Sequence, residues 1–150
     1  MKIVITANGK GSRMSKYGQP KFLLPYKGKR IIDWLYAVFN KPYILTHHNI
    51  DLPYIKCNPT ETRKQTLEYI SDWENVLIVD CDIYIEQFTH KPLKETLYIC
   101  NGINAGLYYV ESIATLLTNM QGDDIVSGMN NFDIVELKTK HLGTPFDYIS

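Results

Sequence analysis

The chain has 150 residues, 45% of them hydrophobic and 21% charged, and its 16 basic and 16 acidic side chains give a formal net charge of zero. This length and composition predict one globular domain with a sizeable core. A neutral chain without a basic stripe is a poor candidate for binding nucleic acid. Because no apolar run approaches the roughly 20 residues of a membrane span, we expect no membrane partner.

The charges are distributed unevenly along the chain. Residues 1–32 contain eight lysines and arginines and no acidic residue. This asymmetry is typical of an anion-binding surface, although a solvated basic face would give the same pattern. The three cysteines lack the spacing of metal ligands, so we expect free thiols. The chain starts with a predicted strand rather than a signal peptide, so we expect a cytoplasmic location.

Apolar runs and helical spacing alternate along the chain, which is typical of an open α/β sheet built from βαβ units. The predicted strands are 3–6, 43–46, 53–57, 76–79, 96–100, 106–110 and 134–138. The predicted helices are 29–40, 60–70, 111–119 and a short one that starts at 143. Thr60 is the expected N-cap of the second helix, and polar residues predict a loop at 122–131.

A glycine-rich turn, residues 7–13, follows the first predicted strand and reads Ala-Asn-Gly-Lys-Gly-Ser-Arg. Glycine has no side chain, so such a turn can bring backbone N–H groups close to phosphates. Arg13 and Lys21 add two positive charges around the same turn. The pattern predicts a binding site for a nucleoside triphosphate, and an ordinary turn with two surface cations is the alternative.

Two carboxylates, Asp80 and Asp82, follow the predicted strand 76–79. Ligands of open α/β sheets bind outside the carboxyl ends of strands, and alternation places both side chains on one side if the strand continues. Since like charges repel, the pair predicts a bound cation, Mg²⁺ or Mn²⁺. Oxygen atoms of the triphosphate would complete the coordination shell of this cation. Two acids hydrogen-bonded at a strand end are the alternative. His47 and His48 would point to opposite faces of a strand, so a shared metal site is not expected there.

Residues 7–25 resemble the N-terminal signature of the nucleotidyltransferases that couple a nucleoside triphosphate to a phosphorylated small molecule. This family includes the sugar-1-phosphate nucleotidylyltransferases and the phosphocholine cytidylyltransferases. Further segments are similar to the family in the same order, namely 63–67, 79–84, 102–108 and 142–148. The resemblance implies an α/β fold, a single-domain Rossmann-like mixed sheet of the GT-A-like nucleotidyltransferase type in a shortened form.

The resemblance also implies a reaction and a set of roles. A phosphate oxygen of the acceptor would attack the α-phosphorus of the triphosphate, with Arg13 on the leaving pyrophosphate and Lys21 between the α-phosphate and the acceptor phosphate. The nucleotide would be held by Ala7, Asn8, Gly9, Gly11, Ser12, Arg63 and Thr66. The metal ligands would be Asp82 and Asp80, with His141 a weaker candidate, and Asn104 and Gly106 would line the acceptor pocket.

The segment 63–66 and the Asp-x-Asp pair resemble the cytidylyltransferases most, so we expect CMP transfer to a sugar phosphate or a phosphocholine-like alcohol. Arg63 and Thr66 would equally suit a plain helix N-terminus. Two other functions stay open: a glycosyltransferase that holds a nucleotide-sugar at Asp80 and Asp82, and a non-catalytic nucleotide-binding regulatory domain. The sequence leaves the acceptor, the base and assembly into a homo-oligomer undecided.

Overall fold

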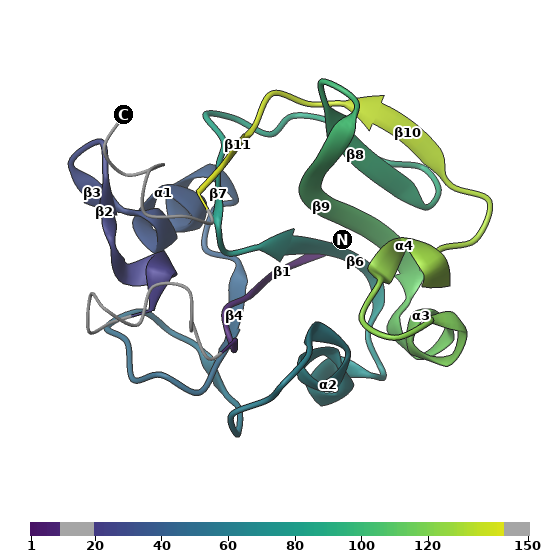
Figure 1. Cartoon of the computed structure of the whole chain (residues 1–150), viewed down its shortest axis with the longest axis horizontal. Coiled ribbons are helices and arrows are strands. Elements are labelled where there is room, and N and C mark those ends of the chain that lie inside the picture. Colours follow the sequence, from purple (N-terminus) through teal and green to yellow (C-terminus); the bar gives the residue numbers. More distant parts are fainter. Residues whose placement is uncertain (10–19, 143–150) are drawn as a thin grey trace.

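The computed structural model describes residues 1–9 and 20–142, and its centre is a seven-stranded mixed sheet with the order β10-β8-β9-β6-β1-β4-β5 (Figure 1). Strands β6, β1, β4 and β5 run parallel, β9 is antiparallel to both β6 and β8, and β10 is parallel to β8. The strands are β1 (Lys2–Thr6), β4 (Tyr43–Thr46), β5 (Ile55–Lys56), β6 (Glu74–Asp80), β8 (Thr96–Cys100), β9 (Ile103–Ser112) and β10 (Asp133–Glu136). The expected mixed α/β architecture is confirmed.

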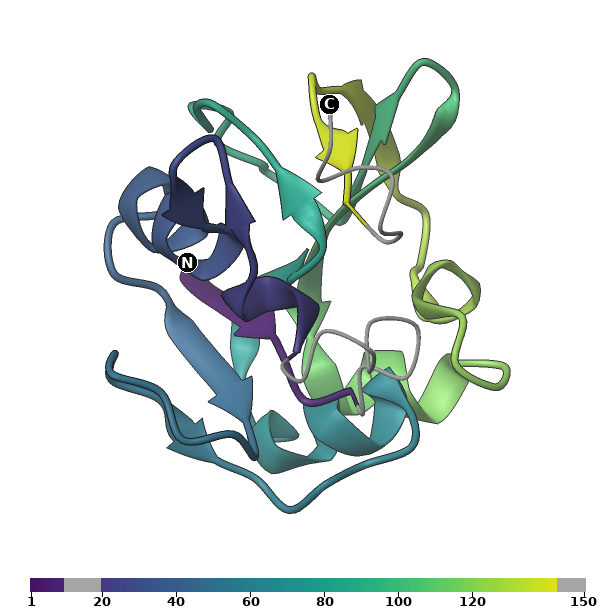
Figure 2. The ribbon, with the colours of Figure 1, turned by 60° about the vertical axis from the view of Figure 1, so that its left-hand side comes forward.

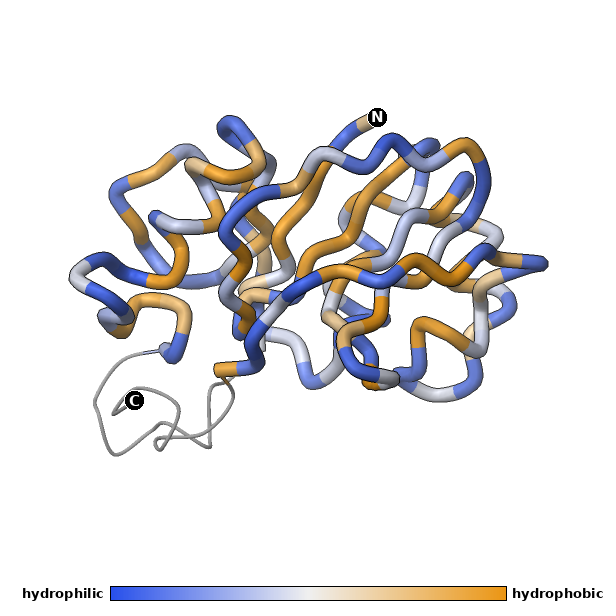
Figure 3. The backbone as a smooth tube through the Cα atoms, turned by 90° about the horizontal axis from the view of Figure 1, so that it is seen from above, coloured by the Kyte–Doolittle hydropathy of each residue, from blue (hydrophilic) through white to orange (hydrophobic). Residues whose placement is uncertain are grey.

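Strands β1 and β6 lie side by side in the middle of the sheet and are covered on both faces. Val4 and Ile5 of β1 are fully buried, and so is the run 76–79 of β6. Continuous apolar runs of this kind form strands that are packed from both sides, because successive side chains point to opposite faces. Figure 3 shows hydrophobic stretches of the backbone running through the centre of the molecule.

Helices cover the two faces of the sheet in separate cores. On one face α1 (Ile31–Val38) packs through Ile31, Ile32 and Leu35 into the core that contains Ile5. On the other face, α2 (Arg63–Leu67), the 3-10 turn η3 (Glu68–Ile70) and α3 (Ile113–Asn119) pack into the core that contains Val4. Figure 2 shows α2 and α3 together, away from α1. The fold therefore has three layers.

Several short elements complete the fold, and the sequence patterns do not predict them. They are η2 (Lys21–Leu23), β2 (Pro25–Tyr26), β3 (Lys29–Arg30), β7 (Ile83–Tyr84), α4 (Ile125–Gly128) and β11 (Lys140–His141). β2 pairs with β3, and β7 pairs with β11, as two separate antiparallel ribbons. In the first ribbon Lys27 and Gly28 both have positive φ, 49° and 84°, which suits a two-residue hairpin turn.

Four local predictions are corrected by the structure. The helix predicted at 29–40 begins at Ile31, because residues 29 and 30 pair with β2. The N-cap of α2 is Thr62 rather than Thr60: Thr62 Oγ1 accepts the N–H of Gln65, whose side chain accepts the N–H of Thr62 in return. The predicted loop 122–131 contains α4, and a further strand, β11, follows the one predicted to be last.

The histidine pair is also arranged differently from the prediction. β4 ends at Thr46, so His47 and His48 lie in a bend and not in a strand. Their rings lie side by side with centroids 3.9 Å apart.

The helix predicted from 143 falls outside the described residues. Within the described part of the chain, no helix combines the length and the apolar character needed to cross a bilayer.

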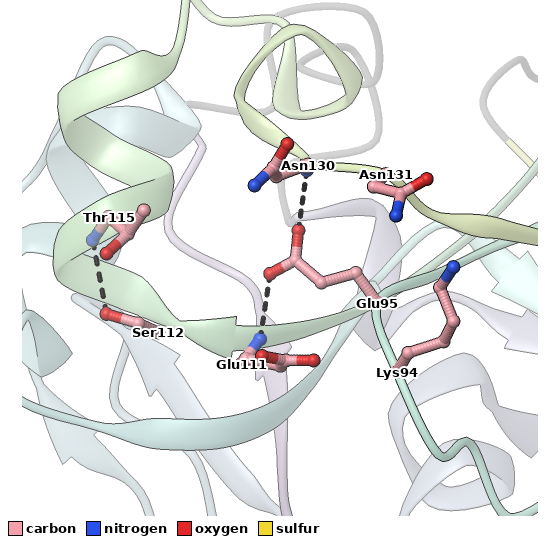
Figure 4. A pocket seen from close by; sticks show the side chains of 7 residues that line it. All are labelled: Lys94, Glu95, Glu111, Ser112, Thr115, Asn130 and Asn131. Carbon is pink, nitrogen blue, oxygen red and sulfur yellow. Dashed lines mark hydrogen bonds between the residues drawn. The ribbon is translucent and has the colours of Figure 1, made fainter.

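The carboxylate of Glu95, just before β8, connects the ends of three segments (Figure 4). Its Oε2 accepts the N–H of Glu111 at 2.9 Å and its Oε1 accepts the N–H of Asn130 at 2.7 Å. It lines a cavity of about 450 Å³ between β9, α3 and the segment after α4. Hydrogen bonds to a charged acceptor are stronger than neutral ones, so this side chain fixes the course of the chain after α4.

We expect Glu95→Gln to lower the free energy of unfolding by about 1–3 kcal/mol, because an amide NH₂ would face one of the two backbone N–H groups. Urea unfolding measures the change. Glu111→Gln is the matched control, since its carboxylate accepts neither of these hydrogen bonds. Equal stability of the two variants would contradict the assigned role of Glu95.

Candidate functional site

A pocket of about 470 Å³ opens at the carboxyl ends of β1 and β6. This is the edge at which ligands of open α/β sheets bind. Its lining joins the end of β1, the start of η2, the start of α2, the end of β6 and one residue that precedes α4. The lining residues are Thr6, Asn8, Gly9, Lys21, Glu61, Thr62, Arg63, Thr66, Asp80, Cys81, Asp82 and Asp123.

Asp80, the last residue of β6, forms an ion pair with Arg63, the first residue of α2. Arg63 Nη1 lies 2.9 Å from Asp80 Oδ1 and 3.1 Å from the hydroxyl oxygen of Tyr108 in β9. Arg63 also donates to the backbone oxygen of Asp123 at 3.4 Å, and Asp123 Oδ1 accepts the N–H of Lys64 at 2.9 Å. Four segments of the chain therefore meet at one guanidinium.

Asp82 pairs with a different cation. Strand β6 ends at Asp80, so residues 81 and 82 form a turn instead of the continued strand that the alternation assumed. Lys21 Nζ lies 3.3 Å from Asp82 Oδ2, and both side chains are 22% exposed. Lys21 is the first residue of η2, which follows Pro20. The two carboxylates line the same pocket although the strand does not continue, and each lies beside its own cation.

Asn8 is nearly fully buried and cross-links the loops around the pocket. Its side-chain amide donates to the backbone oxygen of Asn58 at 2.8 Å and to Thr60 Oγ1 at 2.9 Å, and its Oδ1 lies 2.8 Å from His47 Nδ1. The N–H of Ala7 donates to a backbone oxygen of β4, so this N–H is already used within the sheet. Asn8 and Gly9 line the pocket and Ala7 does not.

Three predicted site residues lie in β9 and β11, next to Asp80 or to each other. Asn104 uses its side chain internally: its Nδ2 donates to Tyr108 Oη at 2.9 Å and its Oδ1 accepts the N–H of Gly106 at 2.8 Å. Gly106 has φ +88°, and a Cβ there would lie 2.8 Å from Ile83 and 3.3 Å from Asp80 Oδ2. His141 Nε2 lies 3.1 Å from the backbone oxygen of Asn104. None of these three lines the pocket, although a Cβ at position 106 would contact Asp80.

Burial and neighbouring charges shift the ionisation of this site. Burial raises the pKa of Asp80 to about 6; the charge of Arg63 opposes the shift and that of Asp82 adds to it. Burial alone would lower the pKa of Arg63, but Asp80 and Tyr108 outweigh burial and raise it. Burial and then the charges of Asp82 and Asp80 raise the pKa of Cys81 to about 12, so Cys81 is a thiol at neutral pH and no nucleophile.

The donor set of the pocket fits a divalent cation shared with phosphate oxygens. Its lining carries four carboxylates, those of Glu61, Asp80, Asp82 and Asp123, against the two cations Lys21 and Arg63. Within residues 1–9 and 20–142, no three His, Cys, Asp or Glu side chains converge as a complete metal site. Mg²⁺ needs no such cage, because it is commonly held by one or two carboxylates together with substrate phosphates.

The structure brings together most of the predicted site residues that it describes. Asn8, Gly9, Lys21, Arg63, Thr66, Asp80 and Asp82 line one pocket. Gly11, Ser12 and Arg13 lie outside the described residues. Sequence reasoning missed Glu61, which lines the pocket, and also Tyr108 and Asp123. The last two lie 45 and 60 residues from Arg63, so no local spacing connects them with it.

Comparison with solved structures places this fold among nucleotidyltransferases. The CTP:phosphocholine cytidylyltransferase from Streptococcus pneumoniae matches with a TM-score of 0.78 at 12% identity, over 99% of this chain and 96% of that one. A nucleoside-diphosphate-sugar pyrophosphorylase from Vibrio cholerae matches with a TM-score of 0.64 at 16% identity, over 98% of both chains. The inositol-1-phosphate CTP transferase from T. maritima matches with a TM-score of 0.69 at 10% identity, over 97% of this chain and 90% of that one.

No protein-family model and no curated protein sequence matches the chain. The likeness is thus one of fold, at sequence identities of 10 to 16%. The nucleotidyltransferase fold implied by the sequence motifs is confirmed.

The raised pKa of Asp80 predicts a pH-dependent stability. Because the folded value of about 6 exceeds the ordinary value of 3.8, the unfolded chain ionises Asp80 first. Stability from this group is complete below about pH 4, and about 3 kcal/mol is lost as the pH rises through 6. We therefore expect the unfolding free energy of Asp80→Asn, relative to the unmodified chain, to increase by about this amount between pH 4 and 7.

Denaturant unfolding in EDTA at several pH values measures this difference. NMR titration of the Asp80 carboxyl carbon gives an independent value, with a midpoint near 6 expected. A midpoint at or below 4, or a pH-independent difference between the two proteins, would contradict the assigned burial of this carboxylate.

Proposed function

We propose that this chain transfers a nucleotidyl group from a nucleoside triphosphate to a phosphorylated small molecule, with release of pyrophosphate. The observation that carries the proposal is the pocket at the end of β6, where Lys21 lies 3.3 Å from Asp82 and Arg63 lies 2.9 Å from Asp80. The glycine-rich turn after β1 enters this pocket at Gly9. The shared nucleotidyltransferase fold supports the same function.

The reaction needs charge neutralisation and positioning more than covalent chemistry. An acceptor phosphate oxygen forms a bond to the α-phosphorus, the bond from that phosphorus to the bridging oxygen breaks, and pyrophosphate leaves with the electron pair. The Lys21 ammonium neutralises charge on the α-phosphate and the acceptor phosphate as they approach each other. Arg13 takes the leaving pyrophosphate in this proposal.

A bound Mg²⁺ or Mn²⁺ would supply further neutralisation of the triphosphate. Asp82 and Asp80 are the residues that would hold it, with His141 the weaker third candidate. Asp82 is the first choice because its side chain is more exposed, 22% against 14% for Asp80, and because Asp80 is held by Arg63 and by the hydroxyl of Tyr108. Among the described residues, both carboxylates at the end of β6 line this pocket, which supports a divalent ion at this place.

The nucleotide would lie along the turn after β1 and the start of α2. Asn8, Gly9 and Thr66 line this side of the pocket, and Gly11 and Ser12 extend the turn in the sequence. Cytidylyl transfer is the preferred form, since the segment 63–66 resembles cytidylyltransferases. The acceptor would be a sugar phosphate or a phosphocholine-like alcohol, close to the β9 segment that contains Asn104 and Gly106.

Binding of nucleotides tests the site without knowledge of the acceptor. In calorimetric titrations of CTP, UTP, GTP, ATP and dTTP with Mg²⁺ or Mn²⁺, we expect one triphosphate to bind selectively. Asp82→Asn is expected to weaken metal-dependent binding about tenfold or more, because one carboxylate ligand is lost. Asp72→Asn, on an exposed residue outside the pocket, is the matched control. Absence of triphosphate binding in the unmodified chain would contradict the proposal.

Pyrophosphate release distinguishes the proposed reaction from the alternatives. With phosphocholine or a sugar 1-phosphate and the selected triphosphate, we expect pyrophosphate in amounts equal to the product. Lys21→Ala should lower kcat/KM by about 10²–10³, the loss typical of one electrostatic contact to developing charge. Lys94→Ala is the control for removing a lysine elsewhere.

Two results would favour other functions. Consumption of a nucleotide-sugar without pyrophosphate would identify a glycosyltransferase that uses the Asp80 and Asp82 pair. Tight triphosphate binding without turnover of any acceptor would identify a regulatory nucleotide-binding domain.

A further inference from the structure

A chain of side-chain hydrogen bonds lies beside the pocket at the end of β6, which we call the nucleotide pocket. It runs from His47 through Asn8 and Thr60 to Thr66. Asn8 and Thr66 line the pocket, and each is only 2% exposed. Every hydrogen bond has one donor and one acceptor, so the direction of this chain decides which atoms remain available to a ligand.

A backbone carbonyl fixes the direction of the chain at Asn8. Asn8 Nδ2 lies 2.8 Å from the backbone oxygen of Asn58, which can only accept a hydrogen bond. Rotating the amide by 180° would place two oxygen atoms against each other, so Oδ1 is the atom that lies 2.8 Å from His47 Nδ1. Because Oδ1 can only accept as well, His47 carries a proton on Nδ1.

The same direction continues to Thr66. The Asn8 amide also donates to Thr60 Oγ1 at 2.9 Å, so the hydroxyl hydrogen of Thr60 points to Thr66 Oγ1, 2.6 Å away. Thr66 Oγ1 in turn donates to the backbone oxygen of Thr62 at 3.2 Å. A hydroxyl has a single hydrogen, so neither threonine has one left for a ligand. Thr66 Oγ1 keeps only an acceptor lone pair.

Packing holds His47 in the position from which it donates to Asn8. Its ring lies against that of His48 with centroids 3.9 Å apart, and His48 packs edge-on against Phe22 at 5.7 Å. Lys56 Nζ donates to the backbone oxygen of His47 at 3.2 Å. Burial and then the charge of His47 lower the pKa of His48, so the neighbouring ring is neutral at pH 7. Contacts from η2 and β5 therefore stabilise the start of the hydrogen-bond chain.

We propose that Asn8, held by His47, is a positioning residue that selects the base of the nucleotide through Thr66. It turns the hydroxyl hydrogens away from the ligand, so that Thr66 Oγ1 accepts a hydrogen bond from an exocyclic amino group of the base. A carbonyl at the same place would set two acceptors against each other, which typically lowers affinity about tenfold or more. This inference rests on the proposed nucleotidyl transfer, and within it favours cytosine or adenine over uracil or thymine.

Two pairs of triphosphates test the selection. CTP and UTP differ in the amino or carbonyl group at position 4 of the base, and ATP and ITP differ in the same way at position 6. Calorimetric titration with Mg²⁺ gives the ratio of dissociation constants within each pair, which a general loss of affinity leaves unchanged. We expect the amino form of at least one pair to bind about tenfold more tightly than its carbonyl form.

Variants test the assigned roles. Thr66→Val removes the acceptor but keeps the shape of the side chain, so we expect it to reduce the ratio to about threefold or less, whereas Thr66→Ser keeps it. Asn8→Ala removes the donor that orients Thr60 and should also lower the ratio about threefold or more. Thr118→Val is the matched control, because Thr118 makes the same kind of bond to the backbone oxygen of Ala114 on an exposed part of α3.

The ring nitrogens of His47 give a readout that needs no nucleotide. In the chain with ¹⁵N-labelled histidine at pH 8, we expect a protonated Nδ1 at His47, and an unprotonated Nδ1 would overturn the assigned direction. Triphosphate binding without an amino preference, or a preference that both Thr66→Val and Asn8→Ala retain, overturns the inference and leaves the proposed function standing. Absence of triphosphate binding overturns the proposed function and this inference with it.

Discussion

The ion pair between Arg63 and Asp80 is the contact on which the rest of the pocket depends. Asp80 ends the central strand and is largely buried, so its charge requires a partner; removing one member of a buried pair typically costs about 3–5 kcal/mol. Arg63 supplies that partner and at the same time reaches Tyr108 of β9 and Asp123 before α4. The first half of the chain and the second half are therefore held together at the floor of the site, by a single guanidinium with several donors.

The pocket is arranged to hold negative charge in a defined geometry while leaving room for more cations. Lys21 and Arg63 each hold one carboxylate, which keeps Asp82 and Asp80 oriented toward the same space. Among the residues that the structure describes, the lining carries four carboxylates and two cations, so the proposed triphosphate would require further positive charge there. Of the eight lysines and arginines in residues 1–32, the structure places Lys21 at this pocket, whereas those at positions 2, 27, 29 and 30 contact other parts of the molecule.

The short ribbons are organised by their surroundings more than by their own sequences. β7 and β11 contribute two residues each, which is too little to be stable alone. Ile83 is fully buried against β9, and the close approach of its side chain to Gly106 leaves no space for a Cβ. This contact holds the ribbon in place. One of its faces packs against β9, and Tyr84 and Lys140 on the other face line a separate cavity.

The sequence by itself determined the central strands, the α/β class and the placement of Asp80 and Asp82 after a buried strand, because burial on both faces and 3.6-residue spacing are local patterns. Only the tertiary structure decided between Thr60 and Thr62 as the N-cap of α2 and revealed α4 and the two short ribbons. Only the tertiary structure also brought Arg63 to Tyr108 and Asp123, which lie 45 and 60 residues away in the sequence. Local patterns encode periodicity and hydrophobicity. Which charged groups meet depends on how the layers pack, since a pair forms only where folding brings both partners to the same buried edge of the sheet.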